Sequence, residues 1–219
     1  MIDLFGPARI QFCEQTLDGW IKHPADTWSN IGPIIAGIAI HYLAKTRLLR
    51  CLGLATVWMG LASAYFHASG TLLGEALDLH GMYMFLFVFM FLQRDQITPL
   101  EIEGDPFEFE YGDMLAVFIL ATGLAGTYLF LPEFGSVFFG LMVIIILAKQ
   151  WMNLTFDRQW YCMIGTFAVG WSFWWLDYLH VLCLPGNHIL TGHAVWHLVC
   201  GLVCWQVFRI YQRGDSYAR

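Results

Sequence analysis

Charged residues are scarce in this sequence. Asp, Glu, Lys and Arg make up 13% of the 219 residues, whereas they make up about 25% of a typical soluble domain. Hydrophobic residues account for 58% of the chain and aromatic residues for 17%. Water cannot cover that much apolar surface, so the composition excludes an ordinary soluble domain and favours an integral membrane protein.

Runs of basic residues are also missing. The net charge is −6, and without a basic patch we expect no nucleic-acid partner. The first 20 residues contain no basic region followed by an apolar core, so we expect no cleaved signal peptide. The first spanning helix would then target the protein to its membrane.

Paired cysteine motifs are lacking as well. The six cysteines (Cys13, Cys51, Cys162, Cys183, Cys200 and Cys204) show no CxxC spacing. Cys200 and Cys204 are expected to be thiols of a helix core. A Cys13–Cys183 bridge on one face of the protein is geometrically feasible, but nothing in the spacing favours it, and we expect both residues to stay reduced.

Seven long apolar stretches are present, and each has a length suited to a spanning helix of about 20 residues. They cover residues 28–44, 51–68, 75–92, 112–131, 134–150, 160–179 and 192–210. Gly70 and Gly74, Pro132, and the Pro-Gly-Asn at 185–187 mark turns between them. An acidic insert at 93–113 separates the third and fourth stretches. The sequence thus predicts an all-α bundle of seven transmembrane helices, forming one domain over residues 1–219.

The positions of the basic residues predict the orientation. With the N-terminus outside, nine of the eleven Lys and Arg residues lie on the inner side, and only Arg9 and Lys22 lie outside. Cytoplasmic loops carry the excess of positive charge, so the sequence favours N-out, C-in.

Ionisable side chains in the spans are few, and such residues are functional candidates because they are costly to bury in lipid. They form four clusters: Ser63 with His67, then Glu75 with Asp78 and His80, then Asp177 with His180, and finally His193 with His197. In the predicted topology all four clusters lie at the same depth, in the outer half of the membrane. This common depth predicts a single site near the non-cytoplasmic face.

The spacing of the histidines predicts a metal centre. His193 and His197 are four residues apart, so both rings project from one face of a helix, as in helical zinc sites. His67 can supply a third nitrogen, which leaves a fourth position open for water, as in catalytic zinc sites. Asp78 could then act as general base, and Ser63 could donate a hydrogen bond to a developing oxyanion.

Plainer interpretations exist for these residues. Buried histidines commonly hydrogen-bond between helices. Haem is disfavoured as a cofactor because two histidines on one helix cannot bind its opposite faces.

Other polar residues of the four clusters have expected roles of their own. His80 and Asp177 could hold the ligand histidines in position, and we expect Glu75 to be solvated at the headgroup level. The cluster Trp171, Trp174 and Trp175 suits a membrane interface or the wall of a lipid-chain pocket.

Together these motifs resemble the alkaline ceramidase family, within a wider group of seven-helix hydrolases that includes the adiponectin and progestin receptors. The resemblance lies in SAYFH at 63–67, Asp78 eleven residues later, and GHAVWH at 192–197, with looser matches in FCE at 12–14 and WSN at 28–30. It implies that His67, His193 and His197 bind zinc, that Asp78 and Ser63 assist catalysis, and that the reaction is hydrolysis of the amide bond of ceramide.

One feature of that family is not matched. Its animal members carry a calcium site in the N-terminal segment, built from several acids and an Asn. Glu14 matches a ligand of that site, but Gln11 and Thr16 stand where an Asp and an Asn would be expected, and Asp18 and Asp26 have different spacings. The resemblance therefore implies zinc, and implies calcium only weakly.

The leading hypothesis from the sequence is a zinc-dependent lipid amide hydrolase that acts within the bilayer on ceramide or a related lipid. The alternative is a receptor-like or lipid-binding protein in which zinc ties helices together with little turnover. A proton or ion pathway is disfavoured because the inner halves of the spans, such as residues 82–91, are apolar.

Overall fold

The computed structural model of the protein describes residues 2–97, 110–153 and 157–217. All extended regular structure in these ranges is helical. The helices are α1 (Pro24–Trp28), α2 (Ile31–Leu43), α3 (Arg47–Ser69), α4 (Leu72–Ile97), α5 (Tyr111–Phe130), α6 (Glu133–Asn153), α7 (Arg158–Tyr178) and α8 (Gly192–Tyr217). Most of the acidic insert predicted at 93–113 lies outside the described residues.

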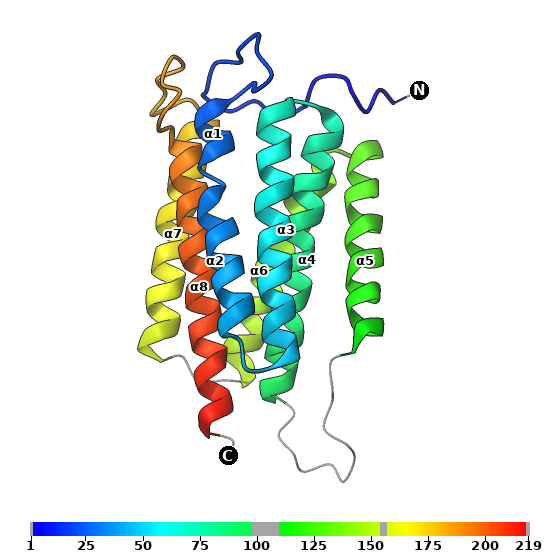
Figure 1. The fold of residues 1–219 in the computed structure, drawn as a ribbon, viewed down its shortest axis with the longest axis vertical. Helices are drawn as coiled ribbons and strands as arrows, with labels where there is room; N and C mark the ends of the chain where they lie inside the picture. Colours follow the sequence, from blue (N-terminus) through cyan, green and yellow to red (C-terminus); the bar gives the residue numbers. More distant parts are fainter. Residues whose placement is uncertain (1, 98–109, 154–156, 218–219) are drawn as a thin grey trace.

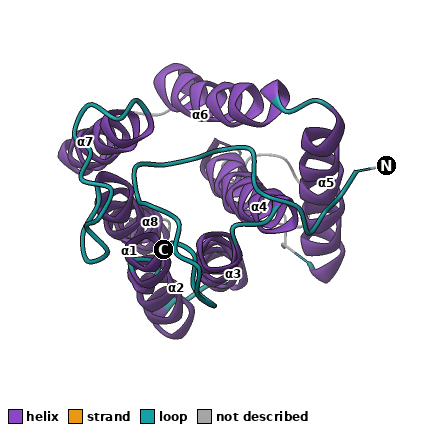
Figure 2. Ribbon diagram, turned by 90° about the horizontal axis from the view of Figure 1, so that it is seen from above, coloured by secondary structure: helices purple, strands orange, loops and turns teal. Residues whose placement is uncertain are grey.

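The long helices stand side by side as one bundle (Figure 1). The N-terminus lies at one end of the bundle and the C-terminal end of α8 at the other. Seen from above, α4 lies nearest the middle, while α5, α6 and α7 lie on the periphery (Figure 2). The most extensive contacts join α3 to α4, α2 to α3 and α7 to α8.

Five helices are long and apolar enough to cross a membrane, which agrees with an integral membrane protein. They are α3, α4, α5, α6 and α8, with spans at Arg47–Ser69, Leu72–Arg94, Gly112–Phe130, Glu133–Met152 and Gly192–Gln212. The expected turns also form: α3 ends at Gly70, whose φ of 63° suits glycine, and α5 ends before Pro132.

The first predicted helix is divided in two. The break falls at Ser29 and Asn30, between α1 and α2. Pro33 has no amide hydrogen to donate to the carbonyl of Ser29, and the N–H of Gly32 bonds that carbonyl instead, at 3.1 Å. The break frees the side chains of Ser29 and Asn30 to turn towards α8.

Helices α2 and α3 approach so closely that their backbones touch. A Cβ atom added to Gly53 would lie 2.6 Å from the backbone nitrogen of His41, and one added to Gly37 would lie 2.7 Å from the carbonyl oxygen of Gly53. These two glycines bring the first helices together at the side of the bundle that carries α1.

Residues 2–23, here called the N-terminal segment, run across the end of the bundle (Figure 2). Their backbone bonds the turn between α3 and α4, for example through Ala8 N–H to Gly70 O at 2.9 Å. Glu75 anchors the segment further, because its carboxylate accepts the N–H groups of Arg9 and Ile10 and the hydroxyl of Tyr128. Glu75 is only 2% exposed, so the prediction that it is solvated at the headgroup level was wrong: the segment covers it and supplies donors.

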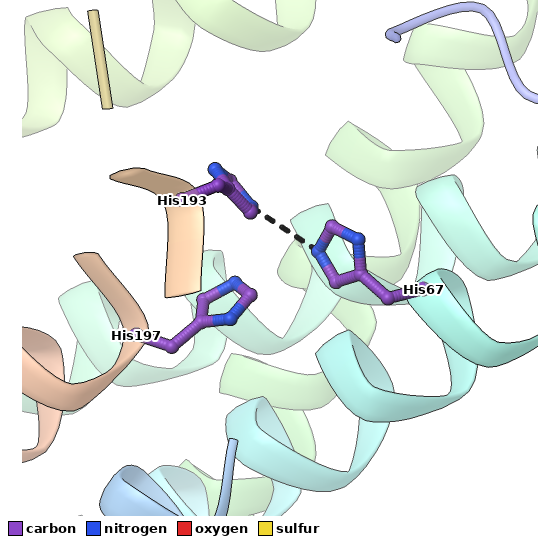
Figure 3. Close-up of side chains that lie close together, drawn as sticks. All are labelled: His67, His193 and His197. Atoms are coloured by element: carbon purple, nitrogen blue, oxygen red, sulfur yellow. Dashed lines mark hydrogen bonds between the residues drawn. The ribbon is translucent and has the colours of Figure 1, made fainter. Parts of the chain in front are cut away.

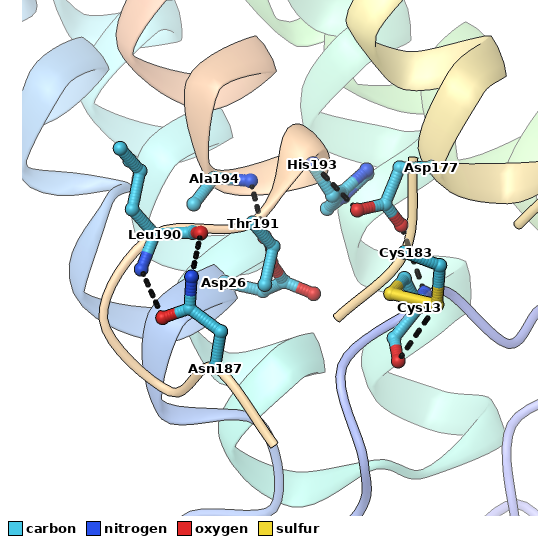
Figure 4. Close-up of a disulfide and its surroundings, with 9 residues drawn as sticks. All are labelled: Cys13, Asp26, Asp177, Cys183, Asn187, Leu190, Thr191, His193 and Ala194. Carbon is cyan, nitrogen blue, oxygen red and sulfur yellow. Dashed lines mark hydrogen bonds between the residues drawn. A yellow bond between two sulfur atoms is a disulfide. The ribbon is translucent and has the colours of Figure 1, made fainter. Parts of the chain in front are cut away.

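A disulfide holds the other part of the segment. Cys13 is bonded to Cys183 in the loop between α7 and α8, with Cα atoms 5.4 Å apart (Figure 4). The prediction that both cysteines stay reduced was wrong, because sequence spacing carries no information about two loops that meet only in the folded chain. Cys51, Cys162, Cys200 and Cys204 are free thiols.

Candidate metal centre

Three histidines from two helices face one another near the end of the bundle covered by the N-terminal segment (Figure 3). His67 comes from the last turns of α3, and His193 and His197 come from the first turns of α8. All three are buried, with exposed fractions of 1%, 3% and 5% respectively. One ligand atom from each ring lies within 4.8 Å of the others, so the group could hold a metal ion.

The nitrogen spacing suits a small metal ion. The Nε2 atoms of His67 and His193 are 3.2 Å apart. Two nitrogens bound tetrahedrally to zinc at about 2.0–2.1 Å lie about 3.3–3.4 Å apart. In addition, Nδ1 of His193 is buried without a hydrogen-bond partner. The donor set therefore fits zinc, since unprotonated imidazole nitrogen is a preferred zinc ligand.

The far side of the His197 ring is fixed by the break between α1 and α2. The hydroxyl of Ser29 lies 2.9 Å from Nδ1 of His197, and the side-chain amide of Asn30 lies 3.3 Å from the same atom. Both side chains are buried. Because Nδ1 is engaged there, Nε2 is the nitrogen of His197 that faces the other two rings.

Ser63 and Asp78 adjoin this group. Ser63 Oγ lies 3.4 Å from Nε2 of His197, and the side chain of Ser63 also interacts with the carboxylate of Asp78. The structure thus brings the five residues selected from the sequence into one connected cluster, with Asp78 reaching the histidines through Ser63.

Asp26 is a further carboxylate at the site, one that the sequence did not mark as part of the metal centre. It belongs to α1 and is fully buried, and its Oδ2 lies 3.9 Å from Nδ1 of His67. Thr191 donates its hydroxyl to the other oxygen, Oδ1, at 2.5 Å. A cation bound by His67 would favour the ionised form of this carboxylate.

Phe12 covers the site from the N-terminal segment. Its ring stacks on His193 with centroids 3.6 Å apart and also lies 5.8 Å from the ring of His67. On its other side it meets Trp174 and Tyr178 of α7. The aromatic contacts continue along α7, where Trp174 stacks on Trp171.

The two residues predicted to support the ligands have different surroundings. Asp177 accepts the backbone N–H of His193 at 3.0 Å and that of Cys13 at 2.8 Å, so it anchors the start of α8 rather than a ligand ring (Figure 4). The ring of His80 accepts from the indole of Trp58 and lies 3.3 Å from the hydroxyl of Thr122. Its described contacts therefore lie away from the three histidines.

The environment of Glu14 does not fit calcium. Its carboxylate accepts the N–H groups of Ala25 and Asp26 at the start of α1. Nδ1 of His188 lies 2.8 Å from the same carboxylate. Among the described residues, the three histidines form the only group of three or more ligand side chains that could hold a metal ion, so the described surroundings of Glu14 provide no calcium site.

Several site residues were missed in the sequence because their signals are weak. Asp26, Ser29 and Thr191 are common residue types in helix-start positions, and nothing in their spacing relates them to His67 or His197. The WSN segment at 28–30 did mark part of this set, but without indicating its contact with α8.

Comparison with protein-family models and with curated proteins finds no match to this chain.

Proposed function

We propose that this protein is a zinc-dependent hydrolase of lipid amides, similar in activity to a ceramidase, that works within a bilayer. The observation that carries the proposal is the buried group of three histidines with Ser63 and Asp78 beside it. The proposal includes seven membrane crossings, made by α1–α2 together, α3, α4, α5, α6, α7 and α8, with the N-terminus outside. The site would then open on the non-cytoplasmic side.

His67, His193 and His197 would hold the zinc ion. A zinc ion with an open position supplies Lewis acidity and lowers the pKa of a water molecule to near neutrality. Three protein ligands support this catalytic arrangement, because structural zinc sites usually have four. A receptor-like role, in which zinc only ties helices together, would call for a fourth protein ligand.

Asp78 and Ser63 would act on the substrate side. Asp78 would accept a proton from the attacking water and return it to the leaving amine, since an amine leaves poorly without an acid. Ser63 would donate a hydrogen bond to the carbonyl oxygen as it gains negative charge. The interaction between the two side chains supports this division of roles, since it places an acid–base group and a donor side by side.

The surroundings of the site support a lipid substrate. Phe12, Trp174, Trp171 and Phe139 form a row of ring contacts that leads from His193 along α7 to α6. Aromatic rings offer apolar area to a hydrocarbon chain. A long-chain amide such as ceramide would fit a site with one polar end and this apolar continuation.

The test is an assay of fatty-acid release from ceramides by the purified protein, with zinc measured per chain. We expect Asp78→Asn to keep its zinc and to lose activity by about 10²–10⁴-fold, the usual contribution of a general acid–base. Ser63→Ala should lose about 10²-fold or more, and Thr122→Ala, near His80, should retain activity. Full activity of Asp78→Asn would contradict the mechanism, and a zinc-loaded protein inert towards all lipid amides would favour the receptor-like role.

A further inference from the structure

Asp26 has an unused carboxylate oxygen beside a ring nitrogen of the metal centre. The residue is 0% exposed, and its Oδ2 has no hydrogen-bond partner. That atom lies 3.9 Å from Nδ1 of His67. Of the described carboxylates, Asp26 alone comes within 4 Å of a ring nitrogen of the three histidines.

Every other polar group of Asp26 is held in place. Its Oδ1 accepts the hydroxyl of Thr191, its backbone N–H donates to Glu14, and its backbone carbonyl accepts from Ser29 and Asn30. These bonds come from the N-terminal segment, the break after α1 and the start of α8. The surroundings thus fix Asp26 and leave Oδ2 facing His67.

We propose that Asp26 is the positioning residue of His67: Oδ2 accepts the proton on Nδ1, so that Nε2 is left unprotonated and directed at the metal. This inference rests on the metal centre of the proposed function. Metal-binding histidines usually donate their second N–H to a carboxylate or carbonyl, which fixes the tautomer and raises the basicity of the ligand nitrogen. The present separation exceeds a hydrogen bond by about 1 Å. A small rotation of the His67 ring would close that gap.

The geometry separates this role from metal ligation. Oδ2 approaches the Nδ1 edge of the His67 ring, whereas the Nε2 edge faces His193 at 3.2 Å. His197 has the matching arrangement, with Ser29 and Asn30 on its Nδ1 edge. Asp26 differs from those two neutral partners by its charge, so it would act more strongly on the basicity of its histidine.

The test compares Asp26→Asn with Glu75→Gln. Both substitutions remove a buried carboxylate at this end of the bundle, but the carboxylate of Glu75 contacts Arg9 and Tyr128 instead of a histidine of the metal centre. The affinity for zinc is measured by competition with a chelator, and the melting temperature of the zinc-free protein is measured in parallel. We expect Asp26→Asn to bind zinc about 10–100-fold more weakly, and Glu75→Gln to bind it normally. A merely structural role would lower the melting temperature and leave the affinity unchanged.

A second comparison shows whether Asp26 acts through His67. In a His67→Ala background, which binds zinc more weakly, adding Asp26→Asn should leave the dissociation constant nearly unchanged. An equal loss in both backgrounds would overturn the proposal, as would wild-type affinity in the single variant. If Asp26→Asn does not fold, Thr191→Val should weaken zinc binding while Thr191→Ser preserves it, and equal affinities in those two variants would overturn the proposal.

These readouts do not depend on turnover. A protein that binds zinc in an Asp26-dependent way but hydrolyses no lipid amide would contradict the proposed function and leave the role of Asp26 intact. Conversely, an active hydrolase whose zinc affinity is unchanged by Asp26→Asn would contradict only the role proposed for Asp26.

Discussion

The ring of Phe12 stacks on the ring of His193, with centroids 3.6 Å apart and planes 24° from parallel. The two residues come from opposite ends of the chain, Phe12 from the N-terminal segment and His193 from the first turn of α8. The contact lays the N-terminal segment directly over the three histidines. The segment therefore covers the candidate metal centre as well as tying the helices together.

The cover should slow the exchange of a bound metal. We expect Phe12→Ala to release zinc to a chelator faster than the wild type, because the apolar ring that shields His193 is lost. The rate can be followed with a chromogenic chelator. Phe5→Ala is the matched control, since Phe5 lies in the same segment but is 75% exposed; equal rates in the two variants would show that Phe12 does not shield the site.

Removal of two histidines should abolish metal binding. We expect His193→Ala/His197→Ala to lose bound zinc, from about one ion per chain, because a single remaining imidazole binds it weakly. Metal content after purification measures this directly. His80→Ala should keep its zinc, because His80 contacts Trp58 and Thr122; zinc retained in the double variant would place the metal elsewhere.

The disulfide should stabilise the N-terminal segment. Cys13→Ser is expected to lower the free energy of unfolding by about 2–5 kcal/mol, the usual cost of losing a native disulfide. A lower melting temperature and faster proteolysis within residues 2–23 would report the change. Cys162→Ser, at an exposed free thiol, should behave as the wild type, and a Cys13→Ser protein equally resistant to protease would show that hydrogen bonds alone hold the segment.

The close approach of α2 and α3 should tolerate no side chain at Gly53. Gly53→Ala places a methyl group against the backbone of His41, so we expect a loss of about 1–3 kcal/mol, as in other overpacked contacts. Gly123→Ala is the control, because nothing lies within 4 Å of its added Cβ and alanine favours the helix by about 0.5–1 kcal/mol. Melting temperatures in one detergent would compare them, and equal values would contradict the predicted clash.

The sequence predicted the helices well because apolar length and breaker residues are local properties. The ends of α5, α6 and α7 lie within three residues of the predicted stretches, since Glu110 and Asp157 cap helix starts and Pro132 interrupts the chain. The first helix was predicted less well. The break depends on the missing N–H of Pro33 and on the hydrogen bond from Gly32 N–H to the carbonyl of Ser29. The pattern of apolar residues does not show these backbone bonds.

The sequence by itself determined the all-helical character of the chain and the selection of His67, His193, His197, Ser63 and Asp78. Helical periodicity places His193 and His197 on one face, and the cost of burying polar groups in lipid singles out the rest. Only the tertiary structure decided the Cys13–Cys183 bridge, the burial of Glu75, the cover by Phe12 and the place of Asp26 behind His67. Each of these joins segments more than 40 residues apart, and such contacts depend on how the helices and loops pack rather than on any local pattern.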